Sequence, residues 1–124
     1  MKYFLISSMA YNESLAERIR LVMQEKQTSY VEKKMMGGLT FMVDDKMCVG
    51  IVGEQLMARI GPDPWEAAIA RDGVNEMMFT GRSMKGYVFV DPEAMDRDEE
   101  LTHWIQLALD HNPLAKASKK RKKK

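Results

Sequence analysis

The most constraining feature of the sequence is a series of short β-prone segments between residues 30 and 60, each separated from the next by a two-residue turn signal. The segments are 30–36, 39–43, 46–52 and 55–60, and the pairs between them are Gly37-Gly38, Asp44-Asp45 and Gly53-Glu54. Glycine and aspartate in two-residue connections are typical of β-hairpins. Parallel strands need crossovers of a dozen or more residues. The pattern therefore predicts an antiparallel meander and excludes a doubly wound parallel sheet.

Three segments with helical periodicity surround and interrupt these strands. The first begins at Asn12, a favourable N-cap, and repeats apolar residues at steps of three and four from Leu15 onward. The second begins at Asp63-Pro64, where Asp63 is expected as the N-cap and Pro64 as the first helical residue. The third has Asp96 as its expected N-cap, and its apolar face contains Leu101, Trp104, Ile105, Ala108 and Leu109.

Two further strands are predicted at 76–79 and 87–90, joined by a polar connection that Gly81 and Gly86 bound. The element order is then helix, strands, helix, two strands, helix. This order predicts the α+β fold class, with a single antiparallel sheet packed against helices. Trp65 and Trp104 lie on the apolar sides of their helices, so both are expected to be buried.

The charge distribution separates a folded body from a basic tail. The chain of 124 residues has 19 basic and 18 acidic residues, and seven of the basic residues lie in 116–124. Residues 1–115 therefore carry 12 basic against 18 acidic residues, a net charge of −6. We expect a single domain over 12–110, preceded by an extension at 1–11 and followed by a disordered tail at 111–124.

The basic tail is expected to bind nucleic acid weakly and without sequence preference, because a Lys or Arg at a phosphate releases counterions. Its cations are Lys116, Lys119, Lys120, Arg121, Lys122, Lys123 and Lys124. No apolar run approaches the ~20 residues of a transmembrane helix, so no membrane partner is expected. The single cysteine does not require an oxidising compartment, so a cytoplasmic location is expected.

Cys48, His103 and His111 are the candidate metal ligands or nucleophiles of the sequence. Their positions argue against both roles. The two histidines are eight residues apart, which is about two turns of one predicted helix, and two turns span roughly 11 Å. That separation is too large for one zinc ion held at about 2 Å by each ligand. Cys48 lies in a predicted central strand, where an inert buried thiol is expected. We expect no metal, no cofactor and no enzymatic activity.

Four separated blocks of the chain carry a resemblance to a known family. The blocks are Met9-Ala10-Tyr11, residues 33–42, residues 56–61 and residues 79–92. In this order they resemble the N-terminal domain of the TfoX/Sxy competence regulators. The resemblance implies a sheet flanked by helices in a secretion-chaperone-like arrangement. It also implies a non-catalytic regulatory or protein-interaction role with the transcription machinery as partner. Full-length members of that family are coactivators that work with the cAMP receptor protein, and they continue into a second, C-terminal domain.

The same blocks contain the candidate functional residues. Lys33, Lys34, Arg82 and Lys85 are expected to form a basic interaction patch on an otherwise acidic body. An alternative function is anion or nucleotide binding, by a small binding protein or enzyme, through a Gly81–Gly86 loop that lacks the spacing of a Walker loop. The twelve methionines allow two interpretations, core filler or an adaptable partner-binding surface, and their position in apolar strand runs favours the first.

Overall fold

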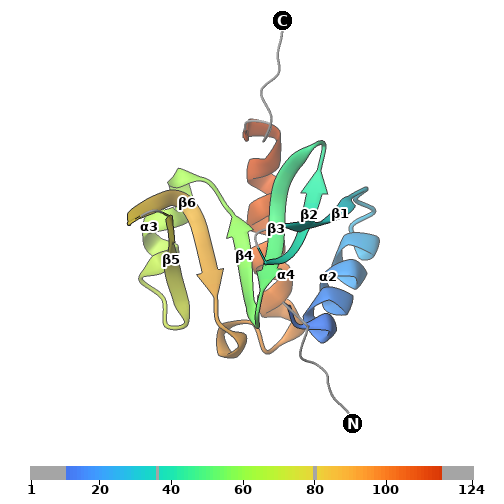
Figure 1. Cartoon of the computed structure of the whole chain (residues 1–124), viewed down its shortest axis with the longest axis horizontal. Coiled ribbons are helices and arrows are strands. Elements are labelled where there is room, and N and C mark those ends of the chain that lie inside the picture. The colour runs from blue at the N-terminus through green and yellow to red at the C-terminus, as the bar shows by residue number, and fades with distance from the viewer. Residues whose placement is uncertain (1–10, 36, 80, 116–124) are drawn as a thin grey trace, which may run out of the picture.

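The computed structural model describes residues 11–35, 37–79 and 81–115, with the backbone alone at 79, 82 and 83. The described residues form one sheet and three α-helices, so the predicted α+β class is confirmed (Figure 1). In chain order the elements are α2 (Glu13–Glu25), β1 (Val31–Met35), β2 (Gly38–Val43), β3 (Lys46–Val52), β4 (Gln55–Arg59), α3 (Pro62–Ile69), β5 (Val74–Phe79), β6 (Arg82–Val90), η1 (Pro92–Ala94), α4 (Asp98–His111) and η2 (Asn112–Leu114).

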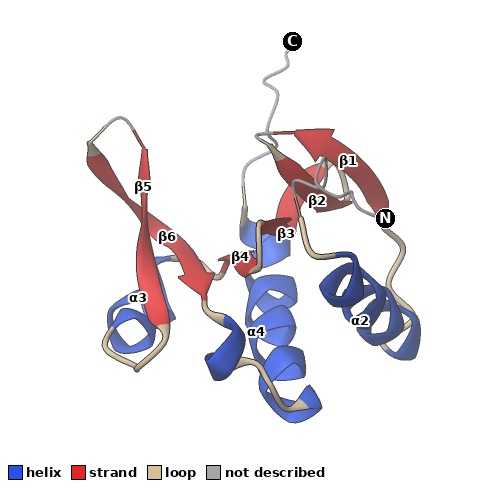
Figure 2. Cartoon of the chain, turned by 60° about the horizontal axis from the view of Figure 1, so that its bottom comes forward, coloured by secondary structure: helices blue, strands red, loops and turns tan. Residues whose placement is uncertain are grey.

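The six strands are ordered β1-β2-β3-β4-β6-β5, and every neighbouring pair is antiparallel. The predicted meander from β1 to β4 is therefore confirmed. After α3, the chain returns to the sheet so that β6 pairs with β4, and β5 lies outside β6. Figure 2 shows α2, α3 and α4 on one side of the strands. One face of the sheet is thus covered by helices, and the edges of the described sheet are β1 and β5.

The hydrophobic core lies between the helices and the sheet. Strand pairing places Leu39, Ile51, Leu56 and Val90 in one row across β2, β3, β4 and β6. This row belongs to the same core cluster as Ile19 of α2 and Trp104 and Ile105 of α4. Trp65 and Trp104 are 7% and 1% exposed, so both predictions of burial are confirmed.

The helix starts are partly as predicted. Asn12 caps α2, since its Oδ1 accepts a hydrogen bond from the backbone N–H of Leu15 at 3.0 Å. The predicted N-cap of α3 is wrong, because the helix begins at Pro62 after Gly61, and Asp63 lies in its first turn. Proline is well suited to a first helical position, and an acidic residue in the first turn is favoured by the helix dipole.

Helix α3 thus starts earlier than predicted, whereas α4 starts one residue later than predicted. Its N-cap is Arg97 instead of Asp96, and the backbone N–H of Arg97 donates to the carboxylate of Glu100 at 3.0 Å. In the predicted capping box, a carboxylate three residues after the N-cap accepts a hydrogen bond from the N-cap backbone. This hydrogen bond is present, but one residue further along the chain than predicted.

The predicted Gly81–Gly86 loop is a strand. Met78 pairs with Ser83 and Phe79 with Arg82, so β5 and β6 form a hairpin and residues 82–86 of the predicted loop belong to β6. Gly86 lies inside β6, where the backbone of Gly61 approaches it: a Cβ at Gly86 would be 3.3 Å from the carbonyl carbon of Gly61. A glycine in a strand often marks such a close approach of backbones.

The fold continues beyond the predicted boundary at residue 110. Helix α4 ends at His111, and η2 follows. Asn112 is 3% exposed, its Nδ2 donates to the carbonyl of Val43 at 3.1 Å, and its own carbonyl accepts from Lys46 Nζ at 3.0 Å. Residues 111–114 are therefore part of the domain, and only 116–124 of the predicted tail and 1–10 of the predicted extension lie outside the described residues.

Tyr11 also belongs to the domain, because it bridges to Gly53 and packs against the core. None of the helices described has the length and apolar character needed to cross a membrane.

Candidate interaction surface

The second face of the sheet, which we call the open face, has no helix over it in the described part of the chain. Its central row runs through Lys33, Thr40, Gly50, Met57 and Phe89, from β1 to β6. Because successive side chains of a strand point to opposite faces, this row alternates with the core row of Leu39 and its partners. None of its side chains belongs to the core cluster between sheet and helices.

The open face is apolar at its centre. Met42 and Met57 are 4% and 1% exposed, and Thr40 is 2% exposed. Gly50 makes room for this packing, since a Cβ there would lie 3.1 Å from Met57 Cε and 3.5 Å from Thr40 Oγ1. Around this centre Met35, Met47, Val52, Tyr87 and Phe89 are half-buried. A strand with one face in water normally alternates apolar and polar side chains. Apolar residues at the outward positions of β4 and β6 are therefore the sequence signal that marks this face.

Two polar clusters border the apolar centre. The guanidinium carbon of Arg59 lies 5.4 Å from the centroid of the Tyr87 ring, which is a cation–π distance. On β4 and β5, Gln55 and Asn75 donate side-chain hydrogen bonds of 2.7 and 3.3 Å to one carboxylate oxygen of Asp91. The face therefore combines methionines, two aromatic rings and an arginine, all of which are frequent in protein-binding surfaces.

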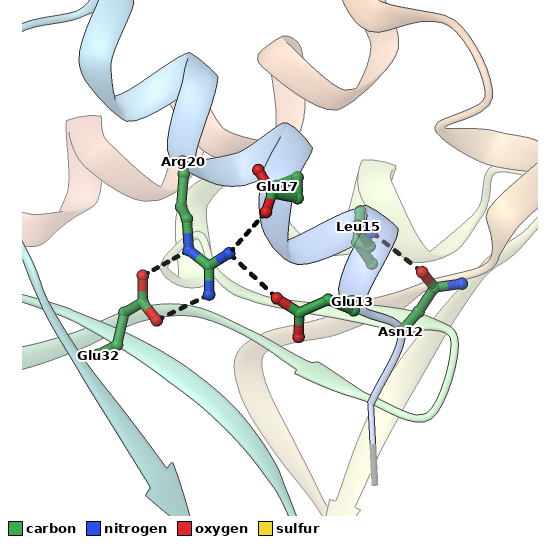
Figure 3. A network of polar contacts seen from close by, with 6 residues as sticks. All are labelled: Asn12, Glu13, Leu15, Glu17, Arg20 and Glu32. Atoms are coloured by element: carbon green, nitrogen blue, oxygen red, sulfur yellow. Dashed lines mark hydrogen bonds and ion pairs between the residues drawn. The ribbon is translucent and has the colours of Figure 1, made fainter. Parts of the chain in front are cut away.

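The β1 edge is stabilised by a charge network with α2 (Figure 3). Arg20 donates from Nε and Nη2 to the two carboxylate oxygens of Glu32, at 2.7 and 3.0 Å. The same guanidinium lies 3.2 Å from Glu13 and 3.4 Å from Glu17. These hydrogen bonds from Arg20 are the main cause that lowers the pKa of Glu32 and keeps it ionised. Its neighbours Lys33 and Lys34 are exposed.

The structure separates the four predicted patch residues into two groups. Lys33 and Lys34 lie on β1, whereas Arg82 and Lys85 lie on β6, four positions away in the strand order. At a strand spacing of about 4.8 Å, the two groups are roughly 19 Å apart across the sheet. Lys85 Nζ lies 5.9 Å from the centroid of the Trp65 ring, and the side chain of Arg82 is outside the described residues. The four residues therefore do not form one contiguous patch, and the seven tail cations also lie outside the described part.

A groove lies between the start of α3 and the end of α4. Its volume is about 380 Å³, and its lining includes Ile60, Pro62, Leu107, His111 and Leu114. Burial, followed by the positive charges of Arg59 and Lys46, lowers the pKa of His111, although Asp63 acts in the opposite direction. His111 is therefore neutral at pH 7. Among residues 11–35, 37–79 and 81–115, no three potential ligands are arranged to hold a metal ion.

Cys48 is 1% exposed on β3, as predicted. Burial raises the pKa of its thiol to about 12. The thiolate is the nucleophilic form of cysteine, so Cys48 is unreactive at neutral pH.

Comparison with known families identifies the class of protein to which this arrangement belongs. The model of the TfoX N-terminal domain matches residues 22–112, which include every strand of the described sheet, α3 and all of α4. The chain therefore belongs to the TfoX N-terminal domain family, as the sequence blocks indicated. Searches of curated proteins and of solved structures gave no match.

Proposed function

We propose that this chain is a non-catalytic regulatory domain that binds a protein partner through the open face of its sheet. The observation that carries the proposal is the apolar character of that face. On the side of the sheet opposite the helices, half-buried Met35, Met47, Tyr87 and Phe89 keep part of their apolar surface accessible around the buried Met42 and Met57. Apolar surface of this kind on a soluble domain typically marks an interaction site.

The residue types favour a protein over other ligands. Methionine side chains are flexible and polarisable, so a methionine-rich face adapts to different partner segments. Nucleic acid is disfavoured because residues 1–115 carry a net charge of −6, which repels phosphate backbones. By the family resemblance, we propose that the partner belongs to the transcription machinery, that the role is connected with competence regulation, and that the protein acts in the cytoplasm.

Site-specific cross-linking in the source cells tests the proposal. A photoreactive phenylalanine analogue would replace Phe89 on the open face, and in a matched control it would replace Leu21, which is 57% exposed on α2. We expect the variant at Phe89 to give a discrete cross-link to a transcription protein, and the variant at Leu21 to give none. Equal products at both positions, or cross-links to nucleic acid alone, would contradict the proposal.

A further inference from the structure

In the described sheet, the β1 edge combines backbone groups that pair with no further strand and two exposed lysines. β1 pairs with β2 on one side, and the described sheet ends there. Every second residue of such an edge strand directs its N–H and C=O away from the sheet. Val31 is 59% exposed, and Lys33 and Lys34 are exposed as well, so this edge is accessible to another chain.

The charge of β1 comes from its two lysines. Glu32 is the single acidic residue of the strand, and its two carboxylate oxygens are both bonded to Arg20 (Figure 3). Lys33 and Lys34 are consecutive, so they point to opposite faces of the sheet. The edge therefore presents one cation above and one below the strand, on a body whose net charge is −6.

The opposite edge of the sheet has a different charge. Among the described side chains of β5, those of Asn75, Glu76 and Met78 are exposed, and none of these three is a cation. An extended acidic segment would therefore be attracted to β1 and repelled by Glu76 of β5. The lysines also oppose pairing between the β1 strands of two copies, since like charges would then lie side by side.

We propose that β1 is the docking edge for an extended, acidic segment of a partner protein, which adds to the sheet as a further strand. Main-chain hydrogen bonds along β1 provide affinity, and carboxylates on the two faces of the added strand contact Lys33 and Lys34. Lys33 also ends the central row of the open face, so a partner bound at this edge lies next to that face. This inference rests on the protein-interaction function proposed above and names the chemistry of the partner.

Short labelled peptides test the inference with the full chain. The probe is a fluorescent heptapeptide with two adjacent central glutamates flanked by valine and threonine, and binding is followed by fluorescence anisotropy. One control peptide carries lysines in place of the glutamates, and another carries N-methyl groups that prevent strand pairing. We expect the acidic probe to bind, with affinity that falls as salt rises, and neither control peptide to bind.

Charge reversal locates the binding site. Lys34→Glu is expected to weaken binding of the acidic probe at least fivefold, and Lys33→Glu with Lys34→Glu more strongly still. Lys85→Glu changes the net charge of the protein by the same amount as Lys34→Glu, at an exposed position on β6, and is expected to alter the affinity less than twofold. Circular dichroism confirms that each variant is folded.

The inference is overturned if the acidic probe does not bind at millimolar concentration, if the N-methylated peptide binds equally well, or if Lys85→Glu has the same effect as Lys34→Glu. It is also overturned if a DNA duplex competes for Lys33 and Lys34 more strongly than the acidic peptide. Any of these results together with a specific cross-link from Phe89 would reject the β1 edge while the open-face function stands.

Discussion

Replacement of Trp104 by alanine is expected to lower the free energy of unfolding by about 3 to 5 kcal/mol, as is usual for a buried aromatic residue. The side chain is 1% exposed on α4. Its indole N–H donates to the carbonyl of Ala94 at 3.4 Å, and the guanidinium of Arg71 lies 4.9 Å from the ring centroid. The hydrogen bond is long, and an exposed cation–π contact contributes only about 0.5 to 1 kcal/mol. The lost burial and the cavity therefore dominate the effect.

Urea denaturation followed by far-ultraviolet circular dichroism measures this loss, and Trp65 remains as an independent fluorescent probe. With a slope of about 2 kcal/mol per molar urea, the midpoint falls by roughly 1.5 to 2.5 M. Trp104→Phe retains most of the ring volume, so its loss is expected to be smaller, about 1 to 2 kcal/mol. A loss below about 1 kcal/mol for Trp104→Ala would refute the assignment of this face of α4 to the core.

Three further predictions concern a glycine, the histidine of the groove and the basic tail. Gly38→Ala is expected to cost about 1 to 3 kcal/mol, because its Cβ would collide with the backbone carbonyl of Ile51. A Cβ at Gly81 would meet no atom within 4 Å, so Gly81→Ala has only the strain of φ +79°. Urea denaturation should therefore show a smaller loss of unfolding free energy for Gly81→Ala than for Gly38→Ala. A larger loss for Gly81→Ala would contradict the register of β2 and β3. The pKa of His111 is lower in the folded protein than in the unfolded chain. The unfolded chain therefore binds more protons than the folded one as the pH falls below about 7. The contribution of His111 to stability is complete above the ordinary histidine pKa of about 6.5 and is lost as the pH falls towards the lower pKa of the folded state. His111→Gln should flatten that decline between pH 7 and 5, and an unchanged slope would show that another group causes it. Deletion of 116–124 should abolish weak, salt-sensitive DNA binding, whereas sequence-specific binding by the shortened chain would contradict the protein-interaction assignment.

Much of the fold could be predicted from local sequence patterns. The turn pairs between residues 30 and 60 gave the correct strands because a two-residue connection permits only antiparallel pairing. Asn12 was identified correctly because its cap depends on a side-chain oxygen and a backbone N–H three residues away. Gly86 was misinterpreted as the end of a loop, because its role is set by the backbone of Gly61, which is distant in sequence.

The candidate surface was harder to predict because it depends on the strand order. The matching sequence blocks suggested that Lys33 and Lys85 belong to one patch, but β2, β3 and β4 lie between their strands. Side chains alternate between the two faces along each strand, but this pattern alone does not show which residues of two strands share a face. Met57 and Phe89 can be assigned to a common face only after the register of β4 and β6 is known. The sequence alone also could not show that the helices pack on the other face of the sheet.

The methionine methyl groups provide the most direct test of the open face, because methionines lie on both sides of the sheet. Met35 and Met47 are half-buried on the open face, whereas Met23 and Met95 belong to the core beneath the helices. Carbon-13 methyl labelling of methionine, followed by titration with the partner obtained from the Phe89 cross-link, would be recorded by NMR. Binding through the open face predicts that the resonances of Met35 and Met47 shift or broaden while those of Met23 and Met95 stay in place. Shifts confined to Met23 and Met95, or an unchanged spectrum with bound partner, would contradict the proposed interaction surface.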